Sequence, residues 1–324
     1  MSAVTPSPRE DAPPSGKLDQ AYRLYRKRIA RCRTENQFNR IHIAVENYMT
    51  PAEFRYFDAA LAEDPPDAPS REWIARVHRL MPLRKVRPVE FERRGLVKGA
   101  TRYTAAVGSP GQKTLILAFG GAFNRLMLPM PCWLDCLNPA FYDMIVLRDL
   151  SRRLFGMGIH GLGSNFFEAL AALRKHVDPA SYRNTIALGT SSGGLPAVLA
   201  AILLKMDRGI SIGGIDLPAL AGRLRTYGVD DTPYAALLAS RPDPFPEILL
   251  VYCGHHAVDA AAANALHQRV PSRLWEVKNC SGHGLVPTKL RHGRFPPFLS
   301  NILGQSVENP EPVPATAPAS PAFG

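Results

Sequence analysis

The sequence has no long apolar segment. None of its 324 residues belongs to an apolar run near the roughly 18 residues that a transmembrane helix needs. Residues 1–16 contain prolines, serines and acidic side chains in place of an apolar core, so we expect no secretory signal there. These absences predict a cytoplasmic protein with no membrane-spanning segment.

Cysteine is also scarce, with five residues at positions 32, 132, 136, 253 and 280. Their irregular spacing predicts neither a disulfide framework nor a paired metal motif. Cys132 and Cys136 lie four residues apart, but no second pair of ligands accompanies them. We therefore expect reduced thiols, as in a cytoplasmic enzyme, and no metal or organic cofactor.

No zinc-finger, RNA-recognition or helix-turn-helix signature accompanies the positive charge of the chain, which is +11. The basic residues are concentrated in segments 23–33 and 71–94. A field of this sign attracts anions in general, including nucleic acid, anionic lipid and acidic substrates. Without a recognition motif, nucleic-acid binding is not favoured. Solvated basic faces explain most of the charge, and an anionic small-molecule or carrier-bound acyl substrate remains possible.

The sequence does contain a G-x-S-x-G motif, Gly189-Thr-Ser-Ser-Gly193. A short apolar run precedes it, and an apolar pattern with helical spacing follows at residues 195–203. This order of strand, tight turn and helix is the context that a nucleophile elbow requires. The same pattern also fits a glycine-rich turn whose serine is ordinary and whose helix N-terminus binds phosphate.

At these residues the chain resembles the α/β-hydrolase superfamily of serine esterases and lipases. In that family an acid follows the next-to-last strand, and a histidine follows the last one. Residues 247–253 are typical of a buried strand and lead to Asp259. Residues 272–278 alternate like a strand and lead to His283, which lies between two glycines. The resemblance implies that Ser191 is the nucleophile, His283 the general base and Asp259 the orienting acid.

Each of these assignments has an alternative. Ser192 is a rival nucleophile because it is adjacent to Ser191. Asp259 precedes an alanine-rich run, where an aspartate is also an ordinary helix N-cap. The other candidate acids are Asp216, Asp230, Asp231 and Asp243.

Acyl transfer also needs N–H donors for the oxyanion. The first donor expected from the resemblance is the backbone N–H of Ser192. The second should come from the loop after the strand predicted at residues 114–119, where Gly120-Gly121-Ala122 follows. Either Gly121 or Ala122 would supply it, and the pattern does not choose between them. The loop lacks the histidine of the family's HGGG-type loop, and a glycine-rich turn of no special purpose is the alternative.

Strands and helices alternate after residue 110, which predicts an α/β fold with a mostly parallel, twisted sheet and helices on both faces. We expect this α/β-hydrolase domain over residues 86–304. Residues 17–85 predict a helical extension that the basic fold does not contain. The composition of residues 1–16 and 305–324 predicts disorder.

Four local expectations follow from shorter patterns. The hairpin that opens the fold should turn at Arg94-Gly95. Residues 218–240 should hold helices where the family inserts its variable lid. Residues 286–304 should form a last helix that Pro296 and Pro297 interrupt. The arginine-bearing loop at 148–153 leaves the edge of the sheet where ligands of α/β folds bind, so it is a candidate anion contact, with a solvated loop as the alternative.

The function predicted from these features is hydrolysis of a carboxylic ester or thioester through a Ser-His-Asp triad and an acyl-enzyme. An acyltransferase or deacylase that acts on a carrier-bound or saccharide substrate could use the same site. A third possibility is a binding protein that keeps the fold and has lost catalysis. The acyl chain, the leaving group and the oligomeric state are not predicted.

Overall fold

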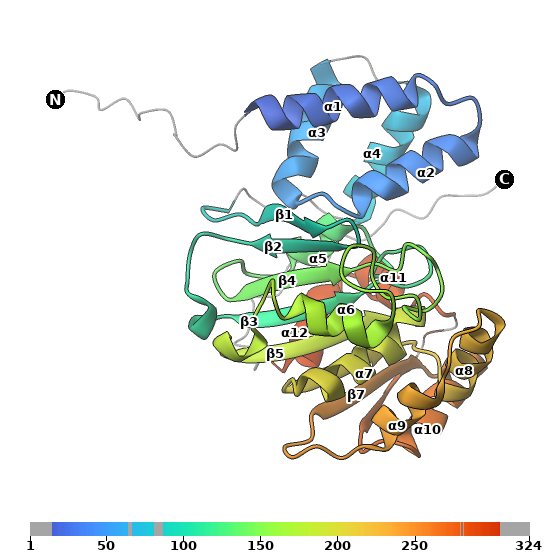
Figure 1. Cartoon of the computed structure of the whole chain (residues 1–324). Helices are drawn as coiled ribbons and strands as arrows, with labels where there is room; N and C mark the ends of the chain where they lie inside the picture. The colour runs from blue at the N-terminus through green and yellow to red at the C-terminus, as the bar shows by residue number, and fades with distance from the viewer. Residues whose placement is uncertain (1–14, 64–66, 81–86, 279, 281, 305–324) are drawn as a thin grey trace.

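The computed structural model describes residues 15–63, 67–80, 87–278, 280 and 282–304. Helices cover both faces of a sheet, and four further helices lie beside its β1 edge (Figure 1). The expected disorder of residues 1–14 and 305–324 lies outside the described residues. Helix α1 begins at Ser15, two residues inside the N-terminal segment that we expected to be disordered.

The described residues form one eight-stranded sheet in the order β1-β2-β4-β3-β5-β6-β7-β8. Strand β2 runs opposite to its neighbours, and the pairs from β4 to β8 are parallel. This mostly parallel sheet confirms the predicted fold class. The strands are β1 Glu92–Val97, β2 Ala100–Thr104, β3 Thr114–Phe119, β4 Tyr142–Leu147, β5 Asn184–Thr190, β6 Arg208–Ile212, β7 Glu247–Cys253 and β8 Arg273–Val277.

Two hydrophobic cores lie on opposite faces of the sheet because successive side chains of a strand point to opposite sides. On β3, Ile116 joins one core and Leu117 the other. The first core is covered by α5 Met130–Asp135, α11 Leu285–Arg291 and α12 Phe295–Leu303. The second is covered by α6 Phe166–Leu173, α7 Gly194–Leu204, α8 Leu217–Thr226, α9 Thr232–Ala239 and α10 Ala257–His267.

The N-terminal extension consists of α1 Ser15–Ile29, α2 Glu35–Glu46, α3 Pro51–Glu63 and α4 Ala68–Leu80. Thr50 and Glu53 form a capping box that starts α3, since each side chain accepts the other residue's backbone N–H. Phe54 and Trp73 are buried in the same core that covers the first face of the sheet. The extension is therefore packed onto the α/β domain.

The predicted position of the hairpin turn is wrong. The chain turns at Lys98-Gly99, and Arg94-Gly95 lies inside β1. A Cβ atom on Gly99 would lie 2.7 Å from the side chain of Ile159, which belongs to a distant loop. Because this contact leaves no room for a Cβ atom, the turn needs glycine at position 99. The contact joins segments that are far apart in the sequence, so the local pattern does not predict it.

The C-terminal helix is divided differently from the prediction. Helices α11 and α12 are separated at His292-Gly293, where Gly293 has φ +65°. Pro296 and Pro297 lie in the first turn of α12, where the missing N–H groups of proline have no helical partner to lose. The prolines thus begin a second helix and do not interrupt a single one.

The expectation of reduced thiols is wrong for Cys253 and Cys280, which form a disulfide. Cys253 ends β7, and Cys280 follows the neighbouring strand β8. A sequence separation of 27 residues thereby becomes a Cα–Cα distance of 5.3 Å. With this disulfide, the cysteines do not support the predicted cytoplasmic location. The location itself stays a prediction. None of the described helices is long and apolar enough to cross a membrane.

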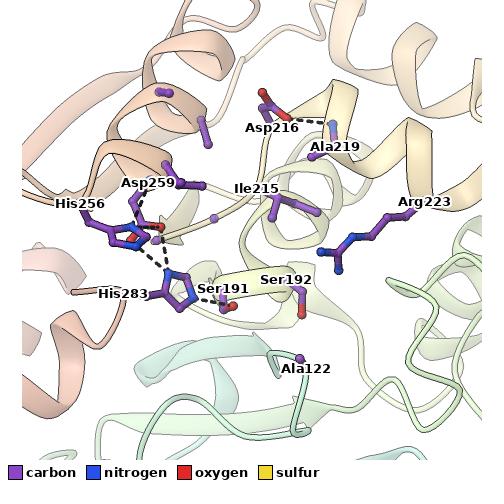
Figure 2. Close-up of a pocket in the computed structure, with 15 residues that line it drawn as sticks. Ala122, Ser191, Ser192, Ile215, Asp216, Ala219, Arg223, His256, Asp259 and His283 are labelled. Carbon is purple, nitrogen blue, oxygen red and sulfur yellow. Dashed lines mark hydrogen bonds and ion pairs between the residues drawn. The ribbon is translucent and has the colours of Figure 1, made fainter.

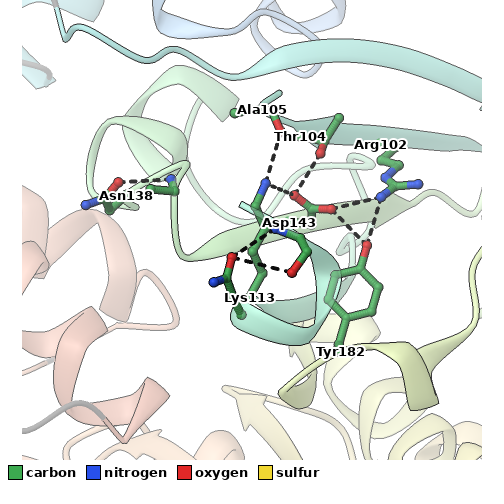
Figure 3. A network of polar contacts seen from close by, with 10 residues as sticks. Arg102, Thr104, Ala105, Lys113, Asn138, Asp143 and Tyr182 are labelled. Atoms are coloured by element: carbon green, nitrogen blue, oxygen red, sulfur yellow. Dashed lines mark hydrogen bonds and ion pairs between the residues drawn. The ribbon is translucent and has the colours of Figure 1, made fainter. Parts of the chain in front are cut away.

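A buried charge cluster joins β2, β4 and the start of β3 (Figure 3). Asp143 and Lys113 are each no more than 2% exposed, and Lys113 Nζ lies 3.1 Å from Asp143 Oδ1. Arg102, Thr104 and Tyr182 each donate a hydrogen bond of 2.8 Å to the same carboxylate. Burial raises the pKa of Asp143, but these hydrogen bonds outweigh it and hold that pKa below its ordinary value.

We expect the change Asp143→Ala to lower the free energy of unfolding by about 3–5 kcal/mol, because it leaves the buried Lys113 ammonium without its counter-ion. Urea denaturation measures this loss. Asp230→Ala is the control, since Asp230 is exposed and its carboxylate accepts hydrogen bonds from Thr232 alone, so this change should lower the free energy of unfolding far less. Equal losses in the two variants would contradict the expected role of the cluster.

Candidate active site

Ser191 lies in a tight turn between β5 and α7. Its backbone has φ +53°, a left-handed conformation that is strained for a residue with a side chain. The turn also needs glycine on both sides. A Cβ atom would lie 1.9 Å from the Gly193 carbonyl oxygen if placed on Gly189, and 2.3 Å from the Phe119 carbonyl oxygen if placed on Gly193. The sequence therefore folds here into a turn that presents the serine hydroxyl above the sheet.

Three side chains from different strand ends meet at this turn (Figure 2). His283 Nε2 lies 2.8 Å from Ser191 Oγ. His283 Nδ1 lies 2.9 Å and 3.1 Å from the two carboxylate oxygens of Asp259. Ser191 follows β5, Asp259 follows β7 and His283 follows β8. The structure thus brings together the three residues that the resemblance implied.

The surroundings of the three groups differ. Asp259 is 4% exposed, whereas the side chain of His283 is 44% exposed and faces the pocket. The hydrogen bond that His283 donates to Asp259 raises the pKa of His283, and partial burial opposes this shift. Among the rival acids, Asp216 also borders the pocket, but its carboxylate accepts the N–H of Ala219 and caps α8.

A second histidine, His256, contacts the same carboxylate. Its Nδ1 lies 3.0 Å from Asp259 Oδ1. We assigned it no role from the sequence, and only its position after β7 could have drawn attention to it. The ligand atoms of His256, Asp259 and His283 lie within 4.8 Å of one another and could hold a metal ion. A metal bound through His283 would compete with its hydrogen bonds to Ser191 and Asp259.

The glycine-rich loop after β3 lies opposite Ser191 and Ser192 (Figure 2). The Gly121 N–H donates to the Arg125 carbonyl oxygen at 2.9 Å, and the Asn124 N–H donates to the Gly121 carbonyl oxygen at 2.8 Å. Ala122 is the second residue of this turn and borders the pocket. Its N–H has no hydrogen-bond partner among the described residues. Of the two donors predicted for this loop, the N–H of Gly121 is occupied and that of Ala122 is available.

A pocket of about 550 Å³ opens over Ser191 and His283. Much of its wall is apolar, formed by residues such as Ala122, Ile215 and Val258. Its volume lies within the range of small-molecule sites, which is about 300–1,000 Å³. Segment 217–239 holds α8 and α9, as predicted, and α8 forms one side of the pocket.

Two observations identify the fold. They are the order of the strands and the positions of Ser191, Asp259 and His283 after the ends of three of them. The chain has the α/β-hydrolase fold. An antiparallel β2 precedes a parallel array, and the three side chains follow β5, β7 and β8 in the chain order serine, acid, histidine.

Solved α/β-hydrolase structures are similar to this chain at low identity. An α/β hydrolase from the metagenome of sediments of the Mar Chica lagoon, Morocco, is 17% identical, with 66% of this chain and 95% of that chain covered and a TM-score of 0.42. The fluorophosphonate-binding serine hydrolase F of Staphylococcus aureus is 11% identical, with 64% of this chain and 98% of that chain covered and a TM-score of 0.45. Esterase B of Lactobacillus rhamnosis is 15% identical, with 73% of this chain and 92% of that chain covered and a TM-score of 0.43. No protein-family model and no curated protein sequence matches the chain.

The predicted anion contact at residues 148–153 is wrong for Arg148. This side chain is fully buried and donates to the side chain of Thr101 and the carbonyl oxygen of Asn47. Its guanidinium also lies 4.0 Å from the ring centre of Tyr48. Arg148 therefore holds the N-terminal extension against the sheet and is not available to a substrate.

Proposed function

We propose that the chain is a serine hydrolase that cleaves a carboxylic ester or thioester through Ser191, His283 and Asp259. The observation that carries the proposal is the unbroken chain of hydrogen bonds from the Ser191 hydroxyl through His283 to the buried Asp259 carboxylate. A serine hydroxyl is a weak nucleophile at neutral pH and needs a base of this kind. The left-handed backbone of Ser191, which presents the hydroxyl above the sheet, also supports this role.

In the proposed reaction, Ser191 Oγ attacks the substrate carbonyl while His283 Nε2 takes the hydroxyl proton. The Asp259 carboxylate accepts a hydrogen bond from His283 Nδ1–H, keeps its charge and stabilises the imidazolium. His283 then gives its proton to the departing alcohol or thiol, which leaves an acyl-enzyme on Ser191. Water, deprotonated by His283, attacks this ester and releases the acid.

The oxyanion would be held by the backbone N–H groups of Ser192 and Ala122. Ser192 follows the nucleophile, and both residues border the pocket. The free N–H of Ala122 supports its choice over Gly121, whose N–H is bonded to Arg125. Preorganised donors of this kind stabilise the transition state more than the substrate, so they raise the rate of acylation.

Labelling with a fluorophosphonate probe tests the proposal. We expect the probe to modify Ser191 in the wild-type protein, as located by peptide mapping, and to label neither Ser191→Ala nor His283→Ala. Absence of labelling in folded wild-type protein would favour the non-catalytic binding protein. Labelling at Ser192 would contradict the assignment of the nucleophile.

Arg223 supports an anionic substrate for this site. It projects from α8 toward the Ser192 side of the pocket (Figure 2). Its side chain forms no ion pair or hydrogen bond with another described residue. The nearby Asp216 carboxylate is engaged with the N–H of Ala219. We propose that the guanidinium binds a carboxylate or phosphate on the substrate, which could be a free small molecule or a carrier-bound acyl group.

We expect Arg223→Ala to raise KM for p-nitrophenyl hemisuccinate about tenfold, because one charge-assisted hydrogen bond is lost. KM for the uncharged p-nitrophenyl butyrate should stay within twofold. Arg225→Ala is the matched control, since Arg225 lies on the same helix, is exposed and does not border the pocket. An equal change of KM for both esters would show that Arg223 does not recognise the negative charge of the substrate.

A further inference from the structure

The N-terminal extension contacts the loop that carries Ala122, and this contact has a consequence for the proposed reaction. Helix α2 ends at Glu46, whose carboxylate is 2% exposed. Trp73 Nε1 and the Arg76 guanidinium, both from α4, donate to Oε1 at 2.8 Å and 2.7 Å. The Arg125 guanidinium, from the loop after β3, donates to Oε2 at 3.0 Å. A single buried carboxylate thus joins two helices of the extension to the loop.

A second bond joins the same two parts of the molecule. The side-chain amide of Asn47 donates to the Phe123 carbonyl oxygen at 3.2 Å. Phe123 follows Ala122 directly, and its side chain is 66% exposed, so its own packing does little to hold the loop. The extension therefore holds this loop at Phe123 and at Arg125, on the C-terminal side of Ala122.

Arg125 acts on the turn from both its backbone and its side chain. Its carbonyl oxygen accepts the N–H of Gly121 and closes the turn around Ala122. Its guanidinium is fixed by Glu46 on the extension. A displacement of Arg125 would therefore move the turn and change the direction of the Ala122 N–H. Bonds to a buried charge are strong because water cannot replace them.

We propose that the extension positions the oxyanion loop, and that Glu46, Asn47 and Arg125 are positioning residues that orient the Ala122 N–H toward the substrate carbonyl. This inference rests on the proposed function. It gives the helices at residues 15–80 a part in catalysis, although none of the three side chains borders the pocket. An oxyanion donor acts in the transition state, so a misplaced donor lowers kcat and leaves KM nearly unchanged.

Two variants around the Glu46 carboxylate distinguish a role in positioning the oxyanion loop from an effect on the stability of the fold alone. Arg125→Met and Arg76→Met each remove one guanidinium from the Glu46 carboxylate, but only Arg125 lies on the oxyanion loop. With p-nitrophenyl butyrate as the substrate, we expect Arg125→Met to lower kcat about 10- to 100-fold with KM within threefold. Arg76→Met should keep kcat within twofold, although its Tm also falls.

Two further variants keep the test decisive if Arg125→Met does not fold. Asn47→Ala removes only the side-chain bond to Phe123 and should lower kcat several-fold at unchanged KM. Arg125→Lys retains the positive charge and should recover part of the lost kcat. Equal kcat in Arg125→Met and Arg76→Met, or a wild-type kcat in Asn47→Ala, would overturn the inference.

Fluorophosphonate labelling separates the failure of this inference from the failure of the proposed function. If the wild-type protein is labelled at Ser191 and hydrolyses the ester, but the loop variants match their control, the extension has no positioning role and the hydrolase proposal stands. If the folded wild-type protein is neither labelled nor active, both proposals fall together.

Discussion

Ser191→Ala is expected to lower kcat for p-nitrophenyl butyrate by about 10⁴-fold or more, because the hydroxyl that would form the acyl-enzyme is removed. Ser191 Oγ is the atom hydrogen-bonded to His283 Nε2 at 2.8 Å. The methyl group of alanine occupies the same turn, so the fold should be retained. Steady-state kinetics measure the loss, and thermal denaturation should give a Tm close to that of the wild-type protein.

Ser192→Ala is the control for this experiment. Ser192 is the neighbouring hydroxyl and also borders the pocket, but its proposed contribution is its backbone N–H, which alanine retains. We expect kcat within about fivefold of the wild-type value. An active Ser191→Ala protein together with an inactive Ser192→Ala protein would reverse the assignment of the nucleophile.

The parts of the site that the sequence predicts are those formed by neighbours in the chain. The elbow at residues 189–193 is a local turn, and its glycines are required by contacts within that turn or with the adjacent strand end. The strands before Asp259 and His283 are continuous apolar or alternating runs, so their ends were predicted to within one residue. Parallel strands then bring those ends to one edge of the sheet.

The parts that the sequence does not predict depend on partners far away in the chain. Arg148 and Asn47 are 101 residues apart, and Arg125 and Glu46 are 79 apart. An arginine in a loop has the same local pattern whether it is buried against an extension or faces a substrate. The pairing of Cys253 with Cys280 and the choice of Gly99 for the hairpin turn depend on similar contacts between segments. The direction of the Ala122 N–H likewise follows from how its loop is held.

Asp259→Asn is expected to lower kcat/KM about 10⁴-fold while the residue keeps its shape and place. The carboxylate accepts a hydrogen bond from His283 Nδ1–H, which keeps the proton on Nδ1 and leaves Nε2 free to take the proton of Ser191. An asparagine amide can donate to Nδ1, which places the proton of His283 on Nε2 and stops it from acting as a base. His256→Ala is the control, since it removes the other contact of the carboxylate and should cost less than about tenfold.

Asp259→Asn is also expected to shift the dependence of kcat/KM on pH. The general base must be neutral, so the acid limb of the profile of kcat/KM against pH reports the pKa of His283 in the free enzyme. The hydrogen bond that His283 donates to Asp259 raises this pKa above its ordinary value, and partial burial lowers it. Removal of the carboxylate leaves burial as the remaining influence, so the pKa falls and the acid limb of the residual activity moves to lower pH. A limb that stays in place in Asp259→Asn but moves in His256→Ala would identify His256, and not His283, as the titrating base.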